Sequence, residues 1–393
     1  MPFDITKIAR PNILTLEPYR CARDDFQEGI LLDANENTHG PSFSNITSTE
    51  EELQLNRYPD PHQVVLKKQL CEFRNSERDN LSDSEKLTTD NLCLGVGSDE
   101  SIDALMRCFI APGKGKMVIC PPTYGMYSIC GVVNDVGIVK VPLNHENFDI
   151  IPEDILGAIR ADSDIKLVYI TSPGNPTAKK VSEEKVLQVL ERVEEESLNV
   201  IIILDEAYID FAPVGSSMST LVNRHPNLVV LQTLSKAFAL AGIRLGITFA
   251  NRDISRLLNS MKYPYNISNL TSDVAIRATT PESLKETKVK INKIIEQRAI
   301  VLRELLKLKY VGENRGGLDA NFILIEILNK DLQPDNEIAN KLYLTLATEN
   351  KIVVRFRGKE LGCTGCLRVS IGTAEENAIL IETFERVLNE INS

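Results

Sequence analysis

The sequence predicts an α/β protein with a large domain built on a mainly parallel central sheet and a smaller α+β domain. Between residues 92 and 250, short apolar runs of strand length alternate with segments of helical periodicity, which is typical of an open parallel sheet. The run 199–204 is almost entirely aliphatic, as in strands that are buried on both faces. From about Thr271 the alternation gives way to longer helical segments with fewer strands, which indicates a second unit.

The strands of the large domain are expected at residues 92–95, 117–120, 137–141, 167–170, 199–204, 228–231 and 246–250. A helix is expected to follow the first strand, because apolar residues recur at helical spacing from Ile102 to Ile110. Another helix is expected to open at Ser182, since apolar residues from Val186 to Val193 lie on one face and glutamates on the other.

The small domain is expected to hold a helical stretch at 290–306, a strand at 322–325, a helix at 338–346 and strands at 352–354 and 367–371. These patterns divide the chain into a large domain at residues 55–270 and a small domain at residues 271–393. The N-terminal arm, residues 1–54, is poor in regular signals and can pack against the small domain. Two polar segments, 42–52 and 76–91, are expected to be exposed loops.

Charge and composition argue against several classes of protein. The net charge of −11 and the pI near 5.1 argue against a nucleic-acid-binding protein. The chain has no apolar run of transmembrane length, and its N-terminus lacks the pattern of a secretory signal, so a cytoplasmic protein is expected. Among the eight cysteines only Cys363 and Cys366 have CxxC spacing, and the four histidines are scattered, so no metal site is expected.

Polar residues follow consecutive predicted strands at the point where each strand ends. Asn175 follows one strand and Asp205 ends the next, with Tyr208 three positions on. Ser235 and Lys236 follow another strand. Because ligands bind at the carboxyl ends of strands in open α/β sheets, these five side chains are expected to share one site. Taken singly, each has an ordinary explanation, such as a solvated lysine, a helix-capping aspartate or a core aromatic residue.

This set of amide, aspartate and lysine side chains at consecutive strand ends suits one cofactor, pyridoxal phosphate. A desolvated lysine amine can form a Schiff base with the aldehyde of the cofactor, and an anion keeps its ring nitrogen protonated. Lys236 is therefore the predicted catalytic residue, and Asp205 is the predicted anion. Asn175 and Tyr208 are expected to donate hydrogen bonds to the ring oxygen, and Tyr124 is expected to stack on the ring face.

The phosphate of such a cofactor needs hydrogen-bond donors and a positive charge. Ser98 and Asp99 open the helix that follows Gly97, and the free N–H groups of a helix N-terminus suit a phosphate. Thr233 and Ser235 supply hydroxyl groups. Arg244 supplies a guanidinium group, which matches phosphate geometry.

Longer motifs are similar to those of a known family. They are the segments Ser172–Thr177, Leu204–Tyr208, Ser235–Lys236, Ala241–Arg244, Leu16–Tyr19, Leu32–Asn37, Arg57–Asp60, Pro122–Tyr127 and Leu367–Gly372. Over nearly the whole chain the sequence resembles the fold-type I pyridoxal phosphate-dependent aminotransferases and, within them, the histidinol-phosphate aminotransferases. Ala178 stands where the family often has glycine, which leaves the geometry of that turn open.

The resemblance implies an activity and the residues that serve it. The activity is transfer of an amino group between L-histidinol phosphate and 2-oxoglutarate, giving imidazole acetol phosphate and L-glutamate, in histidine biosynthesis. The resemblance also implies a homodimer in which Tyr58 reaches the cofactor phosphate of the neighbouring subunit. The substrate-binding residues that it implies are Tyr19, Asn35, Arg355 and Arg368. Arg357 lies close to Arg355 in sequence and competes with it for this role.

Other functions stay open at this point. An aromatic or broad-specificity aminotransferase, or a threonine-phosphate decarboxylase, shares the fold and the cofactor motifs. A non-enzymatic regulator of the same fold would need an added DNA-binding domain, and no basic helix-turn-helix precedes Asp33. A purely structural α/β protein would bind no chromophore, so an absorbance spectrum separates it from the others.

Overall fold

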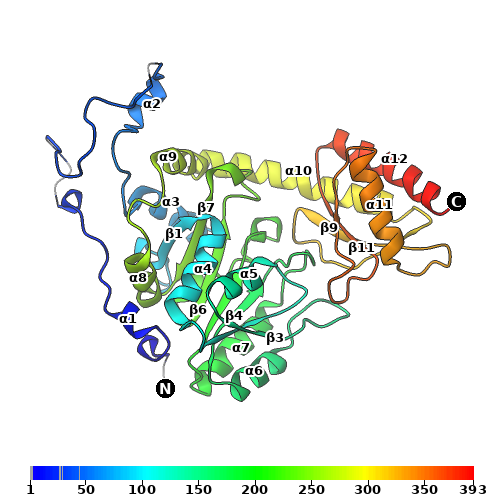
Figure 1. The fold of residues 1–393 in the computed structure, drawn as a ribbon, viewed down its shortest axis with the longest axis horizontal. Helices are drawn as coiled ribbons and strands as arrows, with labels where there is room; N and C mark the ends of the chain where they lie inside the picture. The colour runs from blue at the N-terminus through cyan, green and yellow to red at the C-terminus, as the bar shows by residue number, and fades with distance from the viewer. Residues whose placement is uncertain (1–2, 26–27, 29, 44) are drawn as a thin grey trace.

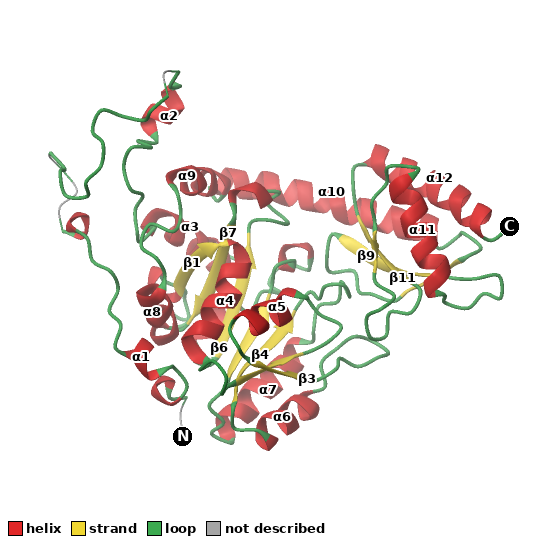
Figure 2. Ribbon diagram, in the orientation of Figure 1, coloured by secondary structure: helices red, strands yellow, loops and turns green. Residues whose placement is uncertain are grey.

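The computed structural model describes residues 3–25, 28, 30–43 and 45–393 and contains two sheets joined by a long helix (Figures 1 and 2). The strands of the large domain are β1 (Leu92–Val96), β2 (Lys116–Ile119), β3 (Gly137–Lys140), β4 (Ile165–Thr171), β5 (Ile201–Asp205), β6 (Leu228–Thr233) and β7 (Leu245–Ala250). Their spatial order is β1-β7-β6-β5-β4-β2-β3. Only β7 runs antiparallel to its neighbours β1 and β6, so the prediction of a mainly parallel sheet is confirmed.

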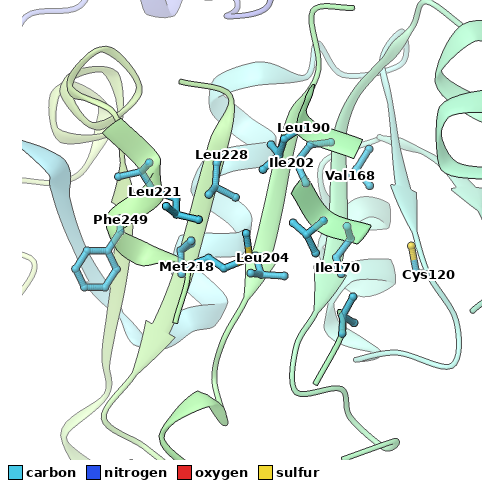
Figure 3. Close-up of a cluster of buried hydrophobic side chains, with 14 of the residues drawn as sticks. Cys120, Val168, Ile170, Leu190, Ile202, Leu204, Met218, Leu221, Leu228 and Phe249 are labelled. Carbon is cyan, nitrogen blue, oxygen red and sulfur yellow. The ribbon is translucent and has the colours of Figure 1, made fainter. Parts of the chain in front are cut away.

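Helices cover both faces of this sheet because its central strands are apolar on both sides. In β5, Ile201 and Ile203 point to one face and Ile202 and Leu204 to the other, and all four are buried. Figure 3 shows part of the second face, where Ile202 and Leu204 lie beside Leu228 of β6.

Two sets of helices form these layers. Those that contribute side chains to the Ile201 face are α1 (Pro11–Leu14), α4 (Gly97–Phe109), α5 (Met126–Val133) and α8 (Arg252–Met261). Those on the Ile202 face are α3 (Val64–Asn75), α6 (Pro152–Ala161), α7 (Glu183–Glu195) and α9 (Asn269–Ala278). Helix α7 begins as predicted, because the Ser182 hydroxyl accepts a hydrogen bond from the backbone N–H of Lys185 at 3.4 Å.

The small domain contains an antiparallel sheet in the order β10-β11-β9-β8. Its strands are β8 (Val311–Asn314), β9 (Phe322–Ile327), β10 (Arg355–Phe356) and β11 (Cys366–Ser370). It packs against α10 (Pro281–Leu305), α11 (Asn336–Thr348) and α12 (Ala374–Ile391) in a separate core. Helix α10 runs from the large domain to the small one (Figure 1).

One predicted strand is wrong. Residues 352–354 are not in a strand, and pairing with β11 begins at Arg355, which lies opposite Arg368. Val354 is buried in the core of the small domain. The apolar residues there are therefore explained by core packing, and they do not pair with another strand. This shift puts Arg355 in a strand beside Arg368, which matters for the site.

The N-terminal residues pack differently from the expectation. Ile8, Ala9 and Ile13 are buried in the core of the large domain, on the Ile201 face, and do not join the core of the small domain. Residues beyond α1 then run along the outside of the large domain (Figure 1) and include the short helix α2 (Ser48–Glu52), where an exposed loop was expected. The division at residues 55–270 stays a prediction.

Within the described residues, no helix combines the length and the apolar character needed to cross a membrane. The same part of the chain holds no cluster of three or more histidine, cysteine, aspartate or glutamate side chains that could bind a metal ion.

Candidate active site

A cavity of about 430 Å³ opens at the carboxyl ends of β4, β5 and β6, between the two domains. Most of the predicted site residues line it: Ser98, Asp99, Tyr124, Asn175, Asp205, Tyr208, Thr233, Ser235, Lys236, Arg244, Arg355 and Arg368. Thr171, Ala207, Ala241 and Arg357 also line it. The structure thus brings together twelve side chains that the sequence placed on separate segments.

Lys236 lies just beyond the end of β6, with its Nζ 5.6 Å from the centre of the Tyr208 ring. The residue is exposed to solvent from the cavity, which is less desolvation than the sequence suggested. The surrounding protein still lowers its pKa, first through partial burial and then through the positive charge of Arg368. A lowered pKa increases the fraction of neutral amine, which is the nucleophilic and basic form.

The turn that carries Lys236 is fixed by hydrogen bonds of Thr233. The Thr233 hydroxyl donates to the carbonyl of Leu245 at 2.8 Å and accepts from the backbone N–H of Ser235 at 3.1 Å. The hydroxyls of Thr233 and Ser235 are also hydrogen-bonded to each other at 2.8 Å. Both hydroxyls therefore stand at the cavity wall with a defined direction.

Asp205 ends β5 and is 3% exposed. Its carboxylate accepts hydrogen bonds from the hydroxyl of Tyr127 at 2.6 Å and from the backbone N–H of Ala207 at 3.1 Å. Both donors are uncharged, and burial raises the pKa of Asp205 above its ordinary value. A cation bound in the cavity beside this carboxylate would stabilise its charged form.

Tyr127 is a site residue that sequence reasoning did not assign. It is fully buried on α5, and its ring stacks on Tyr169 with centroids 4.9 Å apart. Its hydroxyl is hydrogen-bonded to Thr171 at 2.8 Å as well as to Asp205. The sequence signal was its place one helical turn after Tyr124, but that spacing alone does not show which side chain it touches.

The start of α4 approaches β7 closely because both contain glycine. A Cβ atom at Gly97, where φ is +78°, would lie 2.5 Å from Nη2 of Arg244. A Cβ atom at Gly246 would lie 2.4 Å from the carbonyl oxygen of Gly97. Arg244 thereby sits over the N-terminus of α4, with Nη2 3.5 Å from Oδ2 of Asp99. Tyr124 donates a hydrogen bond to the other Asp99 oxygen at 3.1 Å.

Three arginines of the small domain close the other side of the cavity. Arg368 donates a hydrogen bond from Nη1 to Oδ1 of Asn175, and its guanidinium lies over the ring of Phe322. Burial, and then the charge of Arg357, lowers the pKa of Arg368. The Nε atoms of Arg357 and Arg368 are buried without a hydrogen-bond partner. Such unsatisfied donors beside a cavity are suited to an anionic ligand.

Three of the predicted residues do not reach this cavity. Tyr19, Asn35 and Tyr58 lie in or near the N-terminal arm, and all three are exposed. Tyr58 stacks on Tyr265 at 4.6 Å, and Tyr19 meets the same ring edge-on at 6.1 Å. The fold of one chain therefore does not bring these residues to its own cavity.

The cavity has more positive than negative charge. Five cationic side chains line it (Lys236, Arg244, Arg355, Arg357 and Arg368), against the two carboxylates Asp99 and Asp205. Arg357 is neutralised in part by Glu360, whose carboxylate lies 2.8 Å away. The arrangement suits a ligand that carries a phosphate and a carboxylate and that also presents one positive centre to Asp205.

Comparisons with known proteins agree with this geometry. The family described as aminotransferase class I and II matches residues 27–384. A histidinol-phosphate aminotransferase of Candida maltosa is 62% identical over 99% of the chain and the whole of that relative. One of Saccharomyces cerevisiae is 49% identical over 100% of the chain and 99% of the relative.

The chain belongs to the histidinol-phosphate aminotransferase family. The family resemblance inferred from the motifs is thereby confirmed, as is the prediction of an aminotransferase. Among solved structures, a histidinol-phosphate aminotransferase of Sinorhizobium meliloti in complex with pyridoxal-5'-phosphate has the same fold. It superposes with a TM-score of 0.73 and 22% identity, over 91% of the chain and 90% of that structure.

Proposed function

We propose that the chain transfers an amino group between L-histidinol phosphate and 2-oxoglutarate, giving imidazole acetol phosphate and L-glutamate, with pyridoxal phosphate as its cofactor. The observation that carries the proposal is that one cavity holds the amine of Lys236, the buried carboxylate of Asp205 and a cluster of arginines. The names of the family members above, with identities up to 62%, support the choice of substrates.

The residues of the cavity fit this cofactor in kind. Lys236 would hold its aldehyde carbon, and Asp205 would keep its ring nitrogen protonated. When bound, the cofactor withdraws electrons from the substrate carbon that loses its proton. Asn175 bonds to Arg368 through its oxygen, so its NH₂ group is left to donate, together with the Tyr208 hydroxyl, to the ring oxygen. Tyr124 would lie against the ring.

The phosphate would be held where α4 begins. The backbone N–H groups at the start of α4 and the Ser98 side chain lie at one edge of the cavity. The residues expected to complete the phosphate site are Thr233, Ser235 and Arg244. Because Arg244 is only loosely paired with Asp99 at 3.5 Å, a phosphate can compete for its guanidinium.

Lys236 is proposed to carry the proton during the reaction. With the cofactor bound, the Lys236 amine would act as the base that removes the proton from the substrate Cα and then as the acid that gives it back. Its lowered pKa keeps more of the amine in the basic form. The positive charges of Arg368 and Arg244 contribute to this lowering of the Lys236 pKa.

Arg368 and Arg355 are proposed to bind the anionic end of each substrate. They are paired in register on β11 and β10, so their guanidinium groups can act on one carboxylate or phosphate. Arg357 lines the same cavity, but it forms an ion pair with Glu360, which partly neutralises its charge.

The proposal includes a homodimer in which Tyr58 serves the site of the second subunit, with Tyr19 and Asn35 nearby. Tyr19 and Tyr58 are more than half exposed, and Ile30 and Leu32 of the arm are 91% and 76% exposed. Large apolar side chains exposed along one segment are typical of an interface. A second copy of the chain is the partner that would cover them.

Complementation tests both parts of the proposal. Lys236→Ala and Tyr58→Ala are each expected to abolish most turnover, and Lys236→Ala also to remove the visible absorbance of the bound cofactor. Co-expressed in equal amounts, the two variants should recover about a quarter of wild-type activity, because half of the dimers are mixed and one site in each is intact. An active Lys236→Ala chain would refute the catalytic role. A mixture no more active than its parts would refute the shared site.

The substrate is tested separately by single-turnover kinetics. L-histidinol phosphate should react clearly faster than phenylalanine, tyrosine or threonine phosphate. Equal rates would favour a broad-specificity aminotransferase and would leave the role of Lys236 intact.

A further inference from the structure

A second cavity, of about 390 Å³, lies on the large domain between α8, the start of α3 and the N-terminal arm. Four lysine and arginine side chains line it, namely Lys67, Arg252, Arg256 and Lys262. The single carboxylate that lines it among the described residues is Asp90, which lies 3.8 Å from Arg252 with both side chains exposed. In a chain whose net charge is −11, this local excess of positive charge needs a reason.

Lys67 is the residue that makes this cavity unusual. It is 7% exposed, and its Nζ donates to the neutral Oδ1 of Asn259 at a long 3.3 Å. Asp60 attracts its charge, but more weakly than burial and Lys262 disfavour it, and the Asp60 carboxylate accepts hydrogen bonds from the backbone N–H groups of His62 and Val64. Within the described chain Lys67 has no ion-pair partner, and a buried ammonium without a counter-ion is costly.

A second ammonium group makes the situation less favourable. Lys262 also lines the cavity, and its positive charge opposes that of Lys67. Its Nζ donates to the carbonyl of Pro61 at 3.0 Å. Burial lowers the pKa of both lysines. A bound anion would relieve both costs at once, since it would pair with two desolvated cations in one place.

The polar residues around these lysines add donors of the right kind. Arg252 and Arg256 are exposed at the cavity mouth, one turn apart on α8. His62 lines the cavity and is paired with Asp24 at 2.8 Å. The rings of Pro18 and Pro264 also line the cavity and supply apolar surface. None of these side chains lines the cavity of Lys236.

We propose that this cavity binds a small phosphate-bearing molecule, with its phosphate between Lys67 and Lys262 and its organic part against Pro18 and Pro264. Two ammonium groups and two guanidinium groups suit a multiply charged phosphate better than a single carboxylate. The volume exceeds that of a phosphate ion, which leaves room for the organic part. The inference does not rest on the proposed reaction, because the two cavities share no residue.

Calorimetric titration with inorganic pyrophosphate tests the proposal on the full-length chain saturated with pyridoxal phosphate. Lys67→Met and Arg256→Gln are each expected to weaken binding at least about tenfold. Lys68→Met is the matched control, because Lys68 is exposed on the same helix and does not line the cavity. Arg368→Gln should leave this binding unchanged.

Arg256 is exposed, so its variant keeps the test decisive if Lys67→Met does not fold. The proposal is overturned if the wild-type chain does not bind pyrophosphate. It is also overturned if Lys67→Met and Arg256→Gln bind as tightly as Lys68→Met. Loss of binding in Arg368→Gln alone would place pyrophosphate at the other cavity and would equally overturn it.

Discussion

Tyr127→Phe removes one hydroxyl from the buried contact that holds Asp205. The Tyr127 hydroxyl donates to Oδ2 of Asp205 at 2.6 Å, whereas the ring stacks on Tyr169 and would remain after the substitution. A hydrogen bond to a charged group contributes about 1.5–3 kcal/mol. Losing this donor should raise the pKa of Asp205, already raised by burial, still further.

The consequence of this rise is a slower reaction with little loss of substrate binding. With the cofactor bound as proposed, a more basic Asp205 would hold more of the proton that it shares with the ring nitrogen, and the electron withdrawal on which the proton transfer depends would become weaker. If all of the hydrogen-bond energy of about 1.5–3 kcal/mol were lost from the transition state, kcat would fall by about 10- to 100-fold, which is the largest decrease expected. KM for glutamate should change little, because Arg368 and Arg355 are untouched.

Steady-state kinetics and a pH titration of the visible absorbance measure this effect. Tyr169→Phe is the matched control: it removes the same atom from a buried tyrosine, but that hydroxyl donates to the carbonyl of Ile102 at 3.0 Å and makes no contact with Asp205. If Tyr127→Phe and Tyr169→Phe have the same kcat and the same spectral titration, the reasoning is refuted.

Two further changes probe the substrate end and the core. Arg368→Lys should raise KM for glutamate about tenfold with a smaller change in kcat, because a lysine cannot form the paired hydrogen bonds of a guanidinium group. The control is Arg315→Lys, which removes a guanidinium group that is paired with Glu313 outside the cavity. An unchanged KM in Arg368→Lys would contradict the assignment. Burial raises the pKa of Glu206 from 4.5 to about 7. The folded chain therefore binds this proton more tightly than the unfolded chain, and stability should fall as pH rises from about 4.5 to about 7. In Glu206→Gln, the free energy of unfolding measured with urea should fall by on the order of 3 kcal/mol less over this pH range than in the wild type. Parallel pH profiles of the two proteins would disprove this.

The part of the site around Asp205 and Lys236 was predictable because it follows from the order of the strands. Asn175, Asp205 and Lys236 each follow a strand of one parallel sheet, and the ends of neighbouring parallel strands must lie side by side. Periodicity and the aliphatic runs were sufficient to place those strands. Their contacts with other elements were not predictable in this way, which is why the hydrogen bond from Tyr127 to Asp205 was missed.

The arm residues show a different limit. Tyr19, Asn35 and Tyr58 came from family motifs, and the fold of one chain does not bring them to the cavity. Their contacts depend on the molecule that covers the arm, which is proposed to be a second copy of the chain. A single sequence carries little information about such an interface. The strand at 352–354 failed for a local reason, since Val354 is apolar because it packs in a core.

The substrate end of the cavity depends on a contact between the domains. Arg368 comes from an antiparallel sheet whose position relative to the large domain no strand order determines, yet its guanidinium reaches Oδ1 of Asn175. That bond joins the residue proposed to bind the substrate anion to one proposed to bind the cofactor ring. Arg368 also has a buried Nε without a partner, so a substrate anion would share its guanidinium with Asn175. Under the proposed roles, a change at Arg368 reaches the cofactor through the Asn175 amide, so Arg368→Lys should also shift the visible absorbance of the bound cofactor.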